Sequence, residues 1–409
     1  MPGKIPDAAG LASVAPGDIL DTTIAADISA NRSVATLRFQ PSDEVQTLEV
    51  GGLIISSVQV AGVPLMTSRH DTLLELTLPA SDAPVDVRFE YEYPSKGSLN
   101  GAMPTGFTYL WPYWCGNVFP CRSAPSEGST FHLSLTHEHL PVLYPREIPS
   151  DAPSYMVAWT TGDYAQTLLG TTSAGTRVYS WRRSEAVGLV DPQYLAAAFD
   201  WLEQNIGRYR FGSEVGSVTA PWGARGEGGI EHHPYWQVGE AAWGDESLHV
   251  HEAAHGWFGN GVRLQCWEDF VLSEGTSSYL AARALEEAGA PALAAEAWTR
   301  YEAEAQDPLV QMGRAWPDTR CSVDILDPEL RLTSRLTYAK GALFYRAVEA
   351  RIGRPALDLG LRSFYERWAG QAASVQDLLD VLRETSGYDP NPCARSWLAE
   401  PGLPGNICP

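Results

Sequence analysis

The sequence predicts an α+β protein in which an N-terminal antiparallel β-sandwich domain, residues 1–183, precedes a mixed α+β domain, residues 184–409. Three observations lead to this prediction. The length of 409 residues is enough for two or three domains. Apolar and polar residues alternate before the expected boundary, as in half-buried strands, and the apolar spacing becomes helical after it. Hydrophobic residues make up 44% and charged residues 19%, which indicates a folded rather than a disordered chain.

The strands of the first domain are predicted from that alternation. The segment VDVRFEYEY at 85–93 places Val, Phe and Tyr on one face and charged residues on the other. The segment LELTL at 74–78 alternates in the same way, and FHLSLTHEHL at 131–140 begins with the same pattern. Pro, Gly, Ser and Asp separate these short segments, which is typical of an antiparallel sandwich.

The second domain is predicted to be rich in helices. Its first helix is expected in DPQYLAAAFDWLEQNIG, where Gly207 ends the helical pattern. No flexible linker separates the two domains, so we expect them to pack against each other. The further helical stretches are expected at about 246–259, 275–288, 339–352, 356–368 and 375–386.

The charge balance excludes two classes of partner. The chain has 29 Lys and Arg against 50 Asp and Glu, a formal charge of −21, whereas nucleic acids and anionic membranes bind positive surfaces. No apolar run approaches the length of a membrane span. The first residues, MPGKIPDAAGLASVAPGD, lack the basic-then-apolar pattern of a secretory signal. We therefore expect a cytoplasmic protein, or a secreted or periplasmic one if a leader has been removed.

The cysteines leave the compartment open. None of the six forms a CxxC pair, which argues against a thiolate zinc cluster. Cys115 with Cys121, and Cys393 with Cys408, are close enough in sequence to pair in an oxidising compartment. Reduced, half-buried thiols are the alternative that we favour, and Cys266 is expected to be a packed thiol rather than a nucleophile.

The segment ESLHVHEAAHGWFGN carries the clearest chemical pattern. His251, Glu252 and His255 form HExxH, and residues four apart on a helix share a face, so both imidazoles can reach one metal ion. Imidazole nitrogens suit Zn²⁺ at about 2.0–2.1 Å. Glu274, with 18 residues between it and His255, can return on a second helix as the third ligand. Three protein ligands leave the fourth position open, as in catalytic zinc sites.

The alternative is an ordinary amphipathic helix whose histidines face the core or the solvent. Five of the nine histidines fall between residues 232 and 255, which favours the metal site. Another pattern, His137-Glu138-His139, has i, i+2 spacing on an expected strand and is interpreted as a wet sheet face or a packed edge.

HEAAHGWFGNGV followed by LSEGTSSYL resembles the gluzincin zinc aminopeptidases, the family of aminopeptidase N and leukotriene hydrolase. Their pattern is HExxH-x18-E, with WFGN directly after the second histidine. The resemblance implies a thermolysin-like fold for the second domain and one zinc ion per chain. It implies His251, His255 and Glu274 as the zinc ligands and Glu252 as the general base.

Two further segments extend the resemblance, which covers about residues 105–409. GGIEH at 228–232 is similar to the family's GxMEN segment. This implies that Glu231 grips the α-amine of the substrate. The rest of that substrate-binding segment is Gly228, Gly229 and Ile230. TYAKGALF is similar to the YxKG motif and implies that Tyr338 stabilises the transition state.

These residues make a consistent chemistry. Zn²⁺ would lower the pKa of its bound water toward ~7 and polarise the scissile carbonyl. Glu252 would take the proton of the water and pass it to the leaving amine. Tyr338 would donate a hydrogen bond to the developing oxyanion. An anionic Glu231 would pair with a protonated α-amine and so fix cleavage after the first residue.

The sequence also departs from the family. His232 stands where the family has Asn, and YLWPYWCGNVFPC lacks a second acidic or amide anchor for the amine. We therefore expect a weaker amine pocket, or one built partly from aromatic residues such as Tyr113 or Trp114. Ser273 replaces the usual Asn before Glu274, and we expect it to lie beside the zinc ligands without binding the metal itself. Asp269 is expected either to orient a ligating histidine or to be solvated.

The chain also ends where the family's catalytic domain ends, which predicts a more open cleft unless another subunit covers it. The leading interpretation is a zinc aminopeptidase acting on peptides. An alternative is a metalloendopeptidase or amidase acting on blocked or unusual peptides. A non-catalytic peptide-binding relative would be expected to lack a ligand, the base or the tyrosine, and none is lacking here. An oligomer is possible but not indicated.

Overall fold

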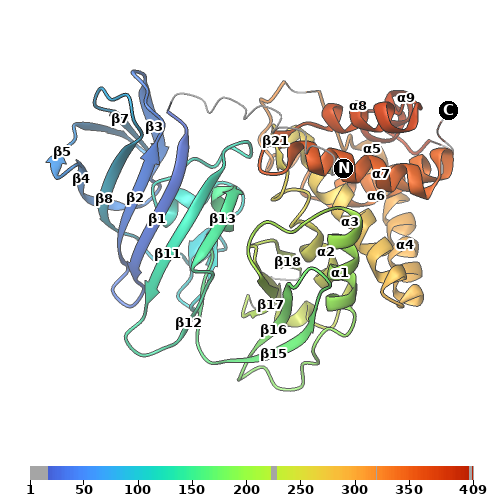
Figure 1. Cartoon of the computed structure of the whole chain (residues 1–409), viewed down its shortest axis with the longest axis horizontal. Helices are drawn as coiled ribbons and strands as arrows, with labels where there is room; N and C mark the ends of the chain where they lie inside the picture. The colour runs from blue at the N-terminus through green and yellow to red at the C-terminus, as the bar shows by residue number, and fades with distance from the viewer. Residues whose placement is uncertain (1–16, 223–227, 319, 405–407, 409) are drawn as a thin grey trace, which may run out of the picture.

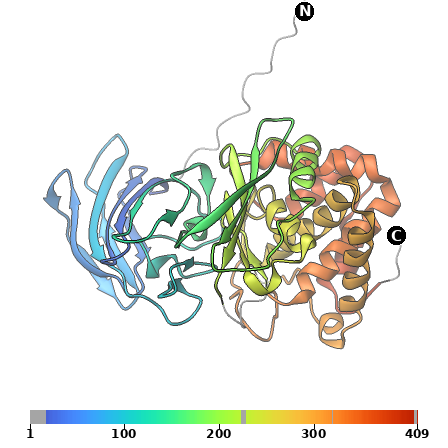
Figure 2. The ribbon, with the colours of Figure 1, turned by 90° about the horizontal axis from the view of Figure 1, so that it is seen from below.

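A computed structural model describes residues 17–222, 228–318, 320–404 and 408. Two parts are visible, a sheet-rich one formed by the first third of the chain and one dominated by helices (Figures 1 and 2). The α+β fold class is confirmed. The expectation about an N-terminal leader concerned residues 1–18, and nearly all of these lie outside the described residues.

Two sheets form the first part. The larger has the strand order β13-β11-β1-β2-β8-β4-β5, and the smaller has the order β3-β7-β6. Neighbouring strands are antiparallel with one exception, since β1 and β11 run parallel and pair Ile24 with Leu133. The strands are β1 (Ile19–Asp27), β2 (Arg32–Phe39), β3 (Val45–Glu49), β4 (Ile54–Val60), β5 (Val63–Pro64), β6 (Thr67–His70), β7 (Leu73–Thr77), β8 (Val85–Glu92), β11 (Ser129–Thr136) and β13 (Glu147–Ala152).

The predicted alternation is present in these strands. In β8, Val85, Val87, Phe89 and Tyr91 are buried, and the charged residues between them are exposed or half-buried. Two-residue strands also pair with one another outside these sheets. The pairs are β9 (Gly101–Ala102) with β10 (Thr108–Tyr109), β12 (Val142–Leu143) with β14 (Thr160–Thr161), and β20 (Arg263–Leu264) with β21 (Ala372–Ala373).

A separate, five-stranded sheet has the order β15-β16-β17-β19-β18. The strands are β15 (Tyr164–Thr171), β16 (Arg177–Arg183), β17 (Glu214–Ala220), β18 (Gly229–Ile230) and β19 (Tyr235–Gly239). The expected boundary at 183/184 falls inside this sheet, because β16 precedes it and pairs in parallel with β17. The antiparallel edge strand β18 carries part of the predicted substrate-binding segment.

Helices cover this sheet and continue to the end of the described chain (Figure 1). They are α1 (Leu195–Asn205), α2 (Glu246–Ala254), α3 (Phe270–Glu287), α4 (Pro291–Ala305), α5 (Pro308–Met312), α6 (Arg335–Ile352), α7 (Arg354–Trp368), α8 (Val375–Ser386) and α9 (Asn391–Ala394). The sequence did not predict α4, which starts at a proline after Ala290 and has no capping side chain to signal it. The expected helix 246–259 ends at residue 254, before the positive φ of Gly259.

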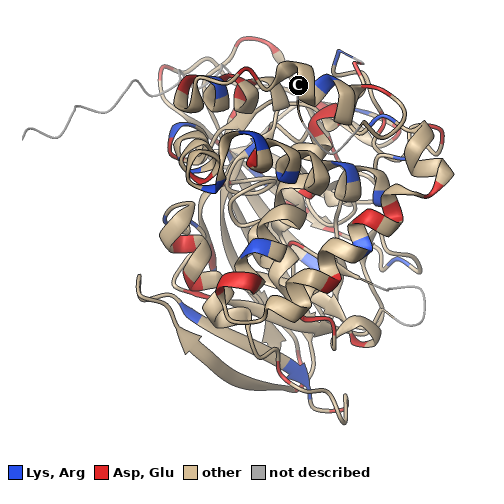
Figure 3. Cartoon of the chain, turned by 90° about the vertical axis from the view of Figure 1, so that its right-hand side faces the viewer, with Lys and Arg blue, Asp and Glu red and all other residues tan. Residues whose placement is uncertain are grey.

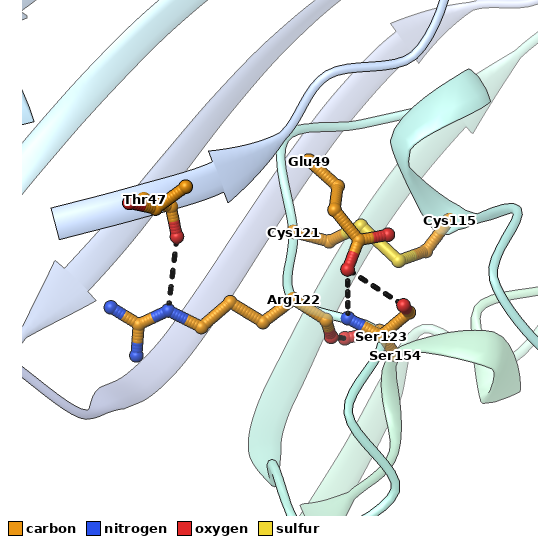
Figure 4. Close-up of a disulfide and its surroundings, with 7 residues drawn as sticks. All are labelled: Thr47, Glu49, Cys115, Cys121, Arg122, Ser123 and Ser154. Carbon is orange, nitrogen blue, oxygen red and sulfur yellow. Dashed lines mark hydrogen bonds between the residues drawn. A yellow bond between two sulfur atoms is a disulfide. The ribbon is translucent and has the colours of Figure 1, made fainter. Parts of the chain in front are cut away.

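All six cysteines form disulfides, Cys115–Cys121, Cys266–Cys321 and Cys393–Cys408. The expectation of reduced thiols is therefore wrong, and Cys266 offers no free thiol. The two short-range pairs are those considered from the sequence, whereas the Cys266–Cys321 pair spans 55 residues and was not considered. Beside the first pair, the Glu49 carboxylate accepts hydrogen bonds from the N–H and the hydroxyl of Ser123, at 2.9 and 2.6 Å (Figure 4).

The two parts pack against each other, as predicted. Buried Arg263 of β20 donates hydrogen bonds to the carbonyls of Ser126 and Asp151, at 3.2 and 3.1 Å. On the helical side, acidic and basic residues are interspersed, so the formal charge of −21 is not gathered into one patch on that face (Figure 3).

Within the described ranges, no helix combines the length and the apolar character needed to cross a bilayer.

Candidate metal and catalytic site

Helix α2 positions the first two predicted ligands. It begins at Asp245, whose carboxylate accepts hydrogen bonds from the N–H groups of Ser247 and Leu248, at 2.9 and 3.3 Å. His251 lies in its last turn, and His255 follows its end with helical backbone angles. The four-residue spacing therefore holds, and the two Nε2 atoms lie 3.1 Å apart.

Glu274 of α3 completes the predicted ligand set. Its Oε2 lies 3.0 Å from His251 Nε2 and 3.4 Å from His255 Nε2, and all three residues are buried. Donors about 2.0–2.1 Å from a tetrahedral zinc ion are separated by about 3.3 Å, so these spacings fit such an ion. His251, His255 and Glu274 thus lie close enough together to hold one metal ion, and two imidazoles with a carboxylate suit zinc.

The outer nitrogen of His255 is held by neighbouring groups. Its Nδ1 lies 3.1 Å from the carbonyl oxygen of Phe258 and from the hydroxyls of Ser273 and Ser277. A hydrogen bond at Nδ1 fixes the ring so that Nε2 faces the metal position. Ser273 therefore lies beside the ligands, in agreement with the expectation from the sequence.

Asp269 differs from both of its predicted roles. It contacts neither predicted histidine ligand by a hydrogen bond in the described part of the chain, and it is buried rather than solvated. Its Oδ1 accepts a 2.9 Å hydrogen bond from the N–H of Val375, at the start of α8. Burial raises the pKa of Asp269 to about 6, although the Val375 hydrogen bond opposes this shift.

Replacing Asp269 by Asn is expected to stabilise the protein by about 2 kcal/mol at pH 7.5 and to have little effect at pH 4. Because the folded-state pKa of Asp269, about 6, exceeds the unfolded value of about 3.8, the wild type loses stability as the pH rises through this window. The raised pKa means that the ionised Asp269 carboxylate destabilises the folded protein by about 3 kcal/mol at pH 7.5. The hydrogen bond from Val375 is weaker by about 1 kcal/mol when its acceptor is an amide oxygen, which leaves the expected net gain of about 2 kcal/mol. Urea unfolding of both proteins at the two pH values tests this, and a difference that does not change with pH would contradict it.

Glu252 lies beside the ligands on the same helix and is buried. A side chain at Gly229 would place its Cβ 2.5 Å from the Glu252 carboxyl carbon, so any larger residue here would displace the Glu252 carboxyl group. Burial raises the pKa of Glu252 well above its usual value, and the charge of His255 opposes the shift.

Glu231 follows β18 and is also buried, with its carboxylate close to that of Glu252 and to His255. The aromatic residues coupled electrostatically to Glu231 include Tyr109 and Tyr155. Of the aromatic residues proposed from the sequence, Tyr113 instead uses its hydroxyl to accept a 2.9 Å hydrogen bond from the N–H of Ile325.

Tyr338, in the first turns of α6, stacks on His251 with 5.6 Å between ring centres and 24° between ring planes. Two glycines bring α6 this close to α3, since a Cβ on Gly275 would lie 2.7 Å from the Cα of Gly341. Burial, followed by the charges of Glu274 and Glu231, raises the pKa of Tyr338 well above its usual value, so its phenol stays protonated.

A cavity of about 340 Å³ opens beside these residues. Its lining includes Gly228, Gly229, His251, Glu252 and Tyr338, but not Glu231, among the described residues. The sequence did not place Arg300, Tyr301 or Glu304 in this lining, because α4, which carries them, was not predicted.

The His137-Glu138-His139 pattern lies away from the site, in the turn after β11. His137 Nδ1 accepts hydrogen bonds from the N–H groups of His139 and Leu140, both at 3.1 Å.

Comparison with known proteins gives one family match. Residues 244–397 match the Peptidase family M1 domain. The chain is 32% identical to aminopeptidase N of Streptomyces lividans over 161 residues, 38% of this chain and 18% of that protein. It is 24% identical to leucine aminopeptidase 2 of Coccidioides immitis over 420 aligned positions, 88% of this chain and 64% of that protein. The chain thus spans less than two thirds of these relatives.

Two solved structures have a similar fold. A mutant of the M1 zinc metallopeptidase of Deinococcus radiodurans, bound to a Tyr-Ser-Ala substrate, superposes with a TM-score of 0.81 at 18% identity and covers 96% of both chains. Leukotriene A4 hydrolase of yeast superposes with a TM-score of 0.77 at 18% identity, covering 95% of this chain and 68% of that one.

Proposed function

We propose that this chain, whose residues 244–397 match the Peptidase family M1 domain, is a zinc-dependent aminopeptidase that removes N-terminal residues from peptides. One observation carries the proposal. Glu231 is buried, and one of its carboxylate oxygens lies within 4.8 Å of a carboxylate oxygen of Glu252 and of a ring nitrogen of His255. An ammonium group bound there would place the first peptide bond of a substrate against the metal position.

Each residue has a separate part in the proposed reaction. Glu231 binds the protonated α-amine and fixes the register of the substrate. A zinc ion held by His251, His255 and Glu274 would supply Lewis acidity to the scissile carbonyl and to a water molecule. Glu252 takes a proton from the attacking water and passes it to the leaving amine. Tyr338 donates its phenolic hydrogen to the carbonyl oxygen as negative charge develops.

The direction of the substrate follows from the same arrangement. Glu231 is absent from the lining of the 340 Å³ cavity, whereas Glu252 and Tyr338 line it. With the first residue held at Glu231, the leaving part of the peptide extends into this cavity.

The compartment is part of the proposal. Disulfides persist in oxidising environments and are rare in the cytoplasm. The three disulfides therefore favour a secreted or periplasmic location over the cytoplasmic one.

Mass spectrometry of one peptide set, with free and with acetylated N-termini, tests the proposal on zinc-loaded protein. We expect stepwise loss from free ends, and cleavage of acetylated peptides at least about 100-fold slower, because acetylation removes the charge that pairs with buried Glu231. The Glu252→Gln variant shows whether the cleavage belongs to this site. Internal cuts, or equal cleavage of acetylated peptides, would instead indicate the endopeptidase or amidase alternative.

A further inference from the structure

Two short chains of buried hydrogen bonds end on the backbone carbonyls of Glu231 and Glu252. We propose that Tyr155 positions Glu231, both through Asn260 and through the direct interaction of its hydroxyl with the Glu231 carboxylate, and that Tyr209 positions Glu252 through His233. Both tyrosines are positioning residues, and this inference rests on the proposed aminopeptidase function.

The first chain joins the sheet-rich part of the protein to the amine site. The Tyr155 hydroxyl donates to Asn260 Oδ1 at 2.7 Å, and Asn260 Nδ2 donates to the carbonyl oxygen of Glu231 at 2.8 Å. The direction is fixed, because a backbone carbonyl accepts only and must face the amide nitrogen of Asn260. All three residues are buried, so solvent does not replace a lost partner.

The second chain ends on the helix that carries the general base. Tyr209 Oη lies 2.8 Å from His233 Nδ1, and His233 Nε2 lies 2.8 Å from the carbonyl oxygen of Glu252. Burial lowers the pKa of His233 to about 3, so its ring is neutral. The carbonyl requires the ring hydrogen on Nε2, which leaves Nδ1 to accept from the Tyr209 hydroxyl.

The end of α2 gives this second chain its importance. The helix stops at Ala254, and the N–H of Gly256 bonds to the carbonyl of Ala253 rather than to that of Glu252. Carbonyls in a last helical turn need partners from outside the helix. The imidazole of His233 meets this need and so holds the backbone of Glu252 beside the predicted ligands.

The two chains act on different steps. The pairing of an α-ammonium with Glu231 is present in both the bound substrate and the transition state, so loosening Glu231 raises KM. Proton transfer by Glu252 occurs only in the transition state, so displacing Glu252 lowers kcat. A purely structural role for either tyrosine would not separate the two constants in this way.

The test compares Tyr155→Phe and Tyr209→Phe with Tyr365→Phe in the full-length, zinc-loaded protein. Tyr365 is a matched control, because it is also buried and its hydroxyl donates to a backbone carbonyl, that of Arg208, at 2.9 Å. With a leucyl peptide substrate, we expect Tyr155→Phe to raise KM about tenfold and Tyr209→Phe to lower kcat about tenfold. Tyr365→Phe should leave both constants within about twofold. Thermal unfolding of all three variants measures any general loss of stability.

A binding measurement isolates the contribution of the amine. Titration calorimetry gives the affinities of leucine hydroxamate and of 4-methylpentanohydroxamate, which differ only by the α-amino group. The preference for the amine-bearing compound should fall about tenfold in Tyr155→Phe and remain unchanged in Tyr209→Phe. If the wild type shows no such preference, the aminopeptidase proposal itself fails. If the wild type shows it but both tyrosine variants behave like Tyr365→Phe, or change alike, only the present inference is overturned.

Discussion

Replacing Glu252 by Gln is expected to lower kcat for peptide hydrolysis by about 10³-fold to 10⁴-fold while the metal content stays at one ion per chain. Gln has the same shape as Glu, so it fits against Gly229, but an amide cannot accept the proton of the attacking water. The three predicted ligands do not include Glu252, and their donor atoms already converge within 3.0–3.4 Å. Steady-state kinetics and elemental analysis of the same preparation measure the two quantities.

The control for this variant is Glu296→Gln, which makes the same chemical change at an exposed position on α4. It should keep full activity. Substantial activity of Glu252→Gln with a normal metal content would show that another group takes the proton and would contradict the proposed role.

The residues of the metal site could be predicted from the sequence because their positions depend on local spacing along the chain. The i, i+4 relation of His251 and His255 survives although the helix ends between them, because His255 keeps helical backbone angles. The position of Glu274 on a second helix was predicted from the spacing of the family pattern HExxH-x18-E. The structure brings His251, His255 and Glu274 together, and the proposed chemistry rests on that proximity.

Other features depend on contacts between distant segments, and the sequence offered no signal for them. The parallel pairing of β1 with β11 joins strands about a hundred residues apart, such as Ile24 with Leu133. The Cys266–Cys321 disulfide and the Tyr155–Asn260 hydrogen bond are equally non-local. Asp269 was misinterpreted for a related reason, since its carboxylate is bonded to the N–H of Val375 at the start of α8, about a hundred residues further along the chain.

Replacing Tyr338 by Phe is expected to lower kcat by about 10²-fold to 10³-fold, with KM changed by less than about threefold. The hydroxyl would meet the carbonyl oxygen of the substrate only as negative charge develops there, so its loss acts on the transition state. Phe retains the ring that stacks on His251, which keeps the metal content and the helix packing unchanged. Kinetics with one dipeptide and one longer peptide, together with elemental analysis, measure the effect.

Tyr345→Phe provides the comparison on the same helix, because the Tyr345 hydroxyl is buried and bonded to Thr276 at 2.6 Å. If both variants lost kcat equally, the loss would reflect a disturbed contact between α3 and α6 and not a missing hydrogen bond to the substrate. The Gly275–Gly341 approach makes that comparison necessary, since it leaves the two helices no space to absorb a shift. A large loss in Tyr338→Phe with normal activity in Tyr345→Phe therefore assigns the effect to the single hydroxyl of Tyr338, a residue that lines the cavity.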